Sequence, residues 1–82
     1  MGFNNYHSKP LGAHRFELVV RSDNGLIKVL RTDVDFGIQV LEENAKLYAK
    51  EMRENGAREI YLDYYNNEIE SPNERRYRTE VL

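Results

Sequence analysis

The sequence predicts an α+β domain in which a single helix packs on a four-stranded, mainly antiparallel sheet, in the chain order ββαββ. Three observations predict this fold: two alternating segments flank a turn sequence, an apolar stripe with helical spacing follows, and two more alternating segments complete the chain. A right-handed connection through the helix would give a β-grasp-like or related topology, and the strand order stays open. With 82 residues, the chain is expected to bury one modest core.

The first two strands are predicted to form a hairpin. Residues 15 to 21 alternate apolar and polar side chains, with Leu18 and Val20 on one face, and residues 22 to 25 (Ser-Asp-Asn-Gly) are typical of a tight turn. A four-residue loop would set Leu18 opposite Val29 and match more apolar pairs than a two-residue loop. Either loop places Val19, Leu26 and Leu30 on the face away from Leu18.

The helix is predicted to run from about Asp33 to Asn55. Thr32 and Asp35 have the spacing of a capping box, and Gly56 provides a C-terminal stop. Gly37 would cost about 1 kcal/mol relative to Ala inside a helix, and less near its end. The apolar stripe that should pack on the sheet consists of Val34, Ile38, Leu41, Ala45, Tyr48 and Met52.

Two more strands are predicted after the helix, at residues 58 to 65 and 76 to 81, joined by a loop at residues 66 to 74 that is rich in turn formers. In the last strand, the pattern puts Tyr77, Thr79 and Val81 on the helix side of the sheet and Arg76, Arg78 and Glu80 on the other side. Residues 1 to 14 show neither the helical nor the strand periodicity of apolar residues and are interpreted as an irregular arm. The domain is therefore expected to comprise residues 15 to 82.

The composition argues against several classes of function. There is no cysteine, which favours the cytoplasm, and no segment approaches the roughly 18 apolar residues of a membrane span. The only histidines, His7 and His14, lie in the arm without metal-ligand spacing or a partner nucleophile. The acidic pairs Glu42/Glu43 and Glu68/Glu70 are interpreted as solvated carboxylates. We therefore expect no cofactor, no metal and no enzymatic activity.

The sheet face away from the helix is the predicted binding surface. It should present the apolar side chains Val19, Leu26, Leu30, Tyr61 and Tyr65. Exposed apolar area that is rich in Tyr and mixed with charges is typical of protein contact sites. This favours a small non-enzymatic protein-binding or regulatory module, either a homodimer or a domain docked on a larger partner, such as an inhibitor or a mobile-element accessory protein. Alternatively, the arm covers this face.

A nucleic-acid-binding module is the second interpretation. It would use the basic residues Arg21, Lys28, Arg75, Arg76 and Arg78, of which all but Arg75 are expected on the same sheet face. Phosphate affinity grows with the number of unopposed cations. The same face is expected to carry four acids, Glu17, Glu59, Asp63 and Glu80. Their negative charges should largely cancel the positive electrostatic potential, which makes this interpretation the weaker one.

Overall fold

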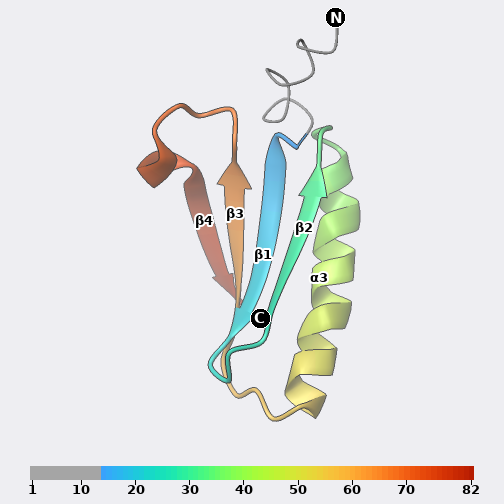
Figure 1. The fold of residues 1–82 in the computed structure, drawn as a ribbon. Helices are drawn as coiled ribbons and strands as arrows, with labels where there is room; N and C mark the ends of the chain where they lie inside the picture. Colours follow the sequence, from blue (N-terminus) through green and yellow to red (C-terminus); the bar gives the residue numbers. More distant parts are fainter. Residues whose placement is uncertain (1–13) are drawn as a thin grey trace, which may run out of the picture.

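The computed structural model describes residues 14–82, and its elements follow the predicted order (Figure 1). They are β1 (Phe16–Ser22), β2 (Ile27–Thr32), α3 (Gly37–Glu54), β3 (Ile60–Asn66), the 3-10 turn η1 (Pro72–Glu74) and β4 (Arg76–Val81). The α+β class and the ββαββ order are confirmed. The strand order in the sheet is β2-β1-β3-β4, and every neighbouring pair is antiparallel. The predicted arm, except for His14, lies outside the described residues.

The hairpin between β1 and β2 has a three-residue loop, so the predicted four-residue loop is wrong. Arg21 pairs with Ile27, and Leu18 pairs with Leu30. Gly25 adopts a left-handed φ of 89°, and the Ser22 backbone N–H donates to the Leu26 carbonyl at 3.0 Å, which closes the loop. A shift of one residue exchanges the two faces of a strand.

The faces of β4 also differ from the prediction. Val81 pairs with Tyr61 and Thr79 pairs with Asp63, so these two side chains lie on the helix-free side, while Arg78 and Glu80 lie on the helix side. Arg76 and Tyr77 lie on their predicted sides. The difference is caused by an irregularity in the register, since Arg78 pairs with Tyr64 but Arg76 pairs with Tyr65.

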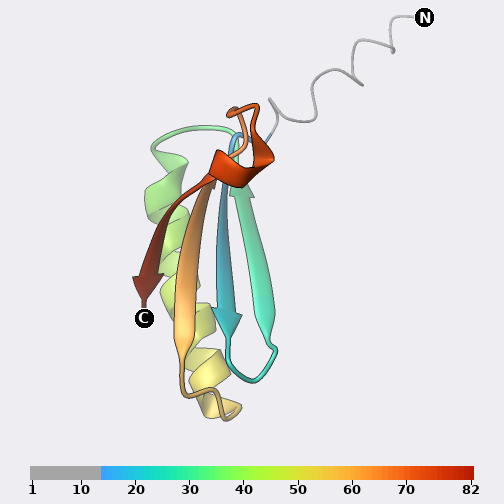
Figure 2. The same ribbon diagram turned by 90° about the vertical axis from the view of Figure 1, so that its left-hand side faces the viewer.

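The helix lies behind the sheet in Figure 2, and the core lies between α3 and the sheet face that it covers. The helix packs mainly on β1 and β2. Ala49 belongs to this core, whereas Tyr48, which the stripe included, is half-buried at its margin. The stripe residues Leu41, Ala45 and Met52 are buried as predicted. The buried apolar residues are Leu18, Val20, Leu41, Ala45, Ala49, Met52, Ala57, Ile60, Leu62 and Tyr64.

The helix begins at Gly37, four residues later than predicted, and the capping box does not form. The Thr32 hydroxyl oxygen instead accepts a hydrogen bond from the Val34 backbone N–H at 3.3 Å, which closes a local turn. Phe36 occupies the N-cap position and makes no side-chain capping bond. Residues 33 to 36 therefore form a turn that leads into the helix, and Gly37 is its first residue.

Tyr64 links the sheet to the helix. Its hydroxyl donates to the Glu42 carboxylate of α3 and lies 3.2 Å from Oε1 of Glu80 in β4. Burial and the neighbouring Glu42 carboxylate raise the pKa of Tyr64 above its ordinary value. The hydroxyl therefore stays protonated and acts as a structural donor.

Removing this hydroxyl should weaken the domain. We expect Tyr64→Phe to lower the free energy of unfolding by about 1–2 kcal/mol, because a buried hydrogen bond to a charged group is lost. Urea denaturation followed by circular dichroism measures the change. Tyr48→Phe is the matched control, since the half-buried Tyr48 donates no hydrogen bond to the described residues. Equal effects of the two substitutions would contradict the assigned role.

Candidate functional site: the open face of the sheet

The side of the sheet away from α3 is called the open face here, because no described element covers it (Figure 2). The pairings align its side chains in three rows across the strands. The first row contains Ile27, Arg21, Tyr61 and Val81; the second contains Val29, Val19, Asp63 and Thr79; the third contains Arg31, Glu17, Tyr65 and Arg76.

The open face includes three of the five predicted partner-binding residues. Val19, Tyr61 and Tyr65 lie on it. Leu26 and Leu30 do not, because the three-residue loop turns them toward the helix, where Leu30 packs against the core. Their places are taken by residues that the prediction missed: Ile27, Val29 and Val81, which are 62%, 44% and 75% exposed. A loop with Gly25 at its third position is the sequence signal that would have indicated this register.

An ion pair with a buried carboxylate lies in the middle of the open face. Asp63 is only 2% exposed, and its carboxylate accepts hydrogen bonds from Arg21 Nε at 2.7 Å and from the Thr79 hydroxyl at 2.8 Å. Burial by itself would raise the pKa of Asp63, but these two hydrogen bonds and the Arg21 charge outweigh it and hold the pKa below its ordinary value. The guanidinium carbon of Arg21 also lies 4.6 Å from the centre of the Tyr61 ring, so one side chain joins β1 to β3.

A second ion pair lies at the β2 side of the face. Arg31 Nε donates to the Glu17 carboxylate at 2.7 Å, and the Asn67 amide also donates to Glu17. Partial burial opposes ionisation of Glu17, yet the bonds from Arg31 and Asn67 lower its pKa. Four charges of the open face are thus paired within the sheet, while apolar side chains on its two edge strands, β2 and β4, stay exposed.

The five basic residues proposed for nucleic-acid binding do not share one surface. Arg21 is paired with Asp63 on the open face, where Arg76 also lies, but Lys28 and Arg78 lie on the helix side. Arg78 pairs with Glu80 there. Arg75 donates from Nε to the Ile69 backbone carbonyl at 2.7 Å. The expectation that Lys28 and Arg78 join Arg21 and Arg76 on one face is wrong.

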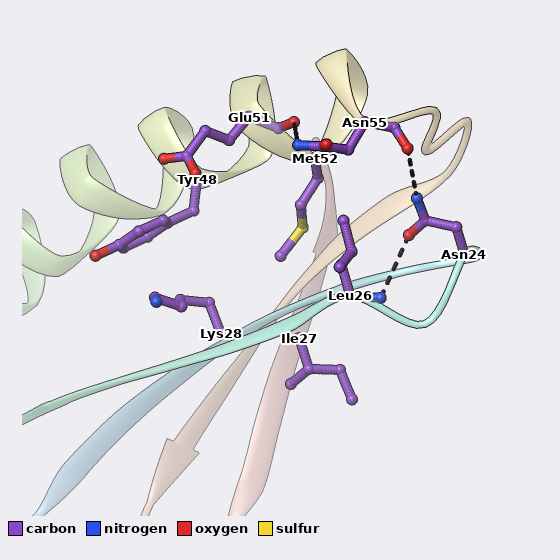
Figure 3. Close-up of a pocket in the computed structure, with 8 residues that line it drawn as sticks. All are labelled: Asn24, Leu26, Ile27, Lys28, Tyr48, Glu51, Met52 and Asn55. Carbon is purple, nitrogen blue, oxygen red and sulfur yellow. Dashed lines mark hydrogen bonds between the residues drawn. The ribbon is translucent and has the colours of Figure 1, made fainter.

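A groove lies on the helix side, between the start of β2 and the last turns of α3, with a volume of about 450 Å³ (Figure 3). Leu26 and Met52 provide apolar walls, and the Lys28 ammonium lies 4.9 Å from the centre of the Tyr48 ring. At one end, the Asn24 amide donates to the Asn55 backbone carbonyl at 3.2 Å. In Figure 3 the Ile27 side chain points away from the helix, in agreement with its place on the open face.

The described residues 14–82 contain no group of three or more His, Asp or Glu side chains placed to hold a metal ion. The buried polar groups of Asp63 and Tyr64 are held in hydrogen bonds. No helix in this part of the chain combines the length and apolar composition needed to cross a bilayer.

Comparisons with protein-family models, curated proteins and solved structures find no match to the chain.

Proposed function

We propose that this protein is a non-enzymatic protein-binding module that docks on a larger protein partner through its open face. The observation that supports this is the exposure of Ile27, Val29 and Val81 around ion pairs that are already satisfied within the sheet. Apolar side chains of this kind gain free energy when a partner covers them, because they leave water. The half-buried Tyr61 and Tyr65 add aromatic area of the type that is enriched in protein interfaces.

The charges of the open face indicate the chemistry of the partner. Arg21, Arg31 and Arg76 lie on it against Glu17, Asp63 and Glu59, of which Glu59 accepts a hydrogen bond from the Tyr61 hydroxyl, so the formal charges balance at +3 − 3 = 0. Among the described residues, no carboxylate lies within 4.0 Å of Arg76, whereas Arg21 and Arg31 are both paired. The fitting partner surface is therefore an apolar patch bordered by a carboxylate that meets Arg76. Such a module would act as a regulator or inhibitor by occupying that surface.

The test is capture of the partner with matched surface variants. We expect Ile27→Glu to abolish capture from a lysate of the native host, because it places a charge in the apolar part of the face. Leu47→Glu is the control, since Leu47 is 64% exposed on the far side of α3 and the same change is made there. Capture by the control but not by Ile27→Glu supports the proposal, whereas equal capture by both contradicts it.

Treating the lysate with nuclease distinguishes a protein partner from a nucleic-acid partner. Proteins that bind through the open face should stay bound after nuclease treatment of the lysate. Material that is released by nuclease, and whose binding falls steeply as salt rises, would indicate the nucleic-acid module instead. Circular dichroism of each variant verifies that it is folded.

A further inference from the structure

The two edge strands of the sheet, β2 and β4, differ in how regular their backbones are. β4 has a register irregularity next to Tyr77, and such a bulge discourages further pairing. β2 pairs regularly with β1 from Ile27 to Thr32 and has no proline within these residues. β2 carries the charges of Lys28 and Arg31, which a partner strand must accommodate, but its regular backbone without a bulge or proline can pair with another strand.

The backbone groups that β2 offers follow from its pairing with β1. The Ser22 N–H donates to the Leu26 carbonyl, and bonded pairs recur at every second position, so Lys28 and Leu30 bond inward to β1. The backbone N–H and C=O groups of Ile27, Val29 and Arg31 therefore point away from the sheet. The side chains of these residues project on the open face.

We propose that a second copy of this chain pairs antiparallel with β2, around a two-fold axis at Val29, and so joins the two sheets into one. In this register Val29 lies opposite Val29 of the second copy, and Ile27 lies opposite its Arg31. All three outward-facing residues of β2 then take part in bonded pairs, which gives the longest pairing that the strand allows. The contact is isologous, as a two-fold interface requires.

The charges and the apolar side chains favour this register over its neighbours. It places Lys28 opposite Leu30 of the second copy, whereas a shift of two residues toward the start of the strand would set Lys28 opposite Lys28, where like charges repel. A shift of two residues toward the end of the strand would leave Ile27 without a partner residue in β2 of the second copy. The chosen register also brings Leu30 of the second copy beside the groove lined by Leu26, Lys28 and Tyr48, where further apolar area is buried.

Cysteine cross-linking tests the register, because the chain has no cysteine of its own. A bonded antiparallel pair has its Cα atoms about 5.5 Å apart, which is within the range of a disulfide. We expect Val29→Cys to form a disulfide-linked dimer under mild oxidation. Ile27→Cys should not, because residue 27 lies opposite residue 31 of the second copy and thus about 14 Å from its own counterpart. Equal cross-linking of both variants would overturn the register.

The backbone contact is tested by proline at the edge. Val29→Pro removes an outward N–H and leaves the bonds to β1 intact, so we expect sedimentation equilibrium to show a folded monomer where the unmodified chain is a dimer. Val81→Pro makes the same change at an outward position of β4, where the side chain is 75% exposed, and should leave the dimer unchanged. A monomeric unmodified chain, or a dimer that survives Val29→Pro, would overturn the proposal.

The dimer and the proposed docking on the open face are independent and can fail separately. Ile27→Glu places a carboxylate opposite Arg31 of the second copy, so it should preserve the dimer while it abolishes partner capture. Loss of capture with an intact dimer supports both ideas. Loss of the dimer in Ile27→Glu would contradict the register, whereas capture that persists in this variant would contradict docking through the open face and leave the dimer supported.

Discussion

Arg21→Met should lower the free energy of unfolding by about 1.5–3 kcal/mol, as measured by urea denaturation at neutral pH. The substitution leaves the buried Asp63 carboxylate with the Thr79 hydroxyl as its remaining side-chain donor. An uncompensated buried charge costs more than a lost surface contact. We place the effect below that of a fully buried pair because Arg21 itself is 41% exposed.

The pH dependence gives this prediction a second readout. The folded-state pKa of Asp63 lies below its ordinary value of 3.8, so the pair stabilises the fold fully above about pH 4, and this contribution is lost as the pH falls through the lower folded pKa. In Arg21→Met the buried carboxylate loses its cation, and its pKa should rise. The stability deficit of the variant should therefore be largest near neutral pH and shrink in acid.

The matched control for Arg21→Met is Arg31→Met, which removes the partner of Glu17 at the side of the same face. This pair is more exposed, so we expect a loss of under about 1 kcal/mol. A deficit for Arg21→Met that does not change with pH, or that equals the deficit of the control, would show that Asp63 does not depend on Arg21.

Gly37→Ala should destabilise the domain by about 1–2 kcal/mol, although alanine is the better helix former. A Cβ at this position would lie 2.5 Å from the Thr32 hydroxyl oxygen and 3.1 Å from Cγ2 of Val34. The Thr32 oxygen cannot move freely, because it accepts the Val34 N–H in the turn before the helix. The steric conflict should outweigh the gain in helix propensity, which is small at the first helical position. Thermal or urea unfolding measures the outcome.

A double-mutant cycle identifies the cause of that loss. Thr32→Ala removes the oxygen that the new methyl group would meet, so Gly37→Ala should cost less in that background than in the native chain. Stabilisation by Gly37→Ala in the native chain would mean that the turn relaxes without penalty. The same cost in both backgrounds would exclude the Thr32 contact as its cause.

The elements of the fold were predictable because their signals are local. Alternation identified the strands, and the spacing of Leu41, Ala45 and Met52 identified the buried stripe of the helix. The start of the helix was not predictable in this way, since Thr32 had the right spacing for a capping box but its hydroxyl bonds to the nearer Val34 N–H. Two local bonds competed for the same side chain, and the pattern did not distinguish between them.

The sequence by itself determined the α+β class, the order of the elements and the presence of one sheet face without a helix. Only the tertiary structure decided which side chains occupy that face. A loop one residue shorter than predicted moved Leu30 to the core and Ile27 to the surface, because neighbouring residues of a strand point to opposite sides. The partners Arg21 and Asp63 lie 42 residues apart, so strand order and register, which depend on long-range pairing, had to be known before their contact was visible.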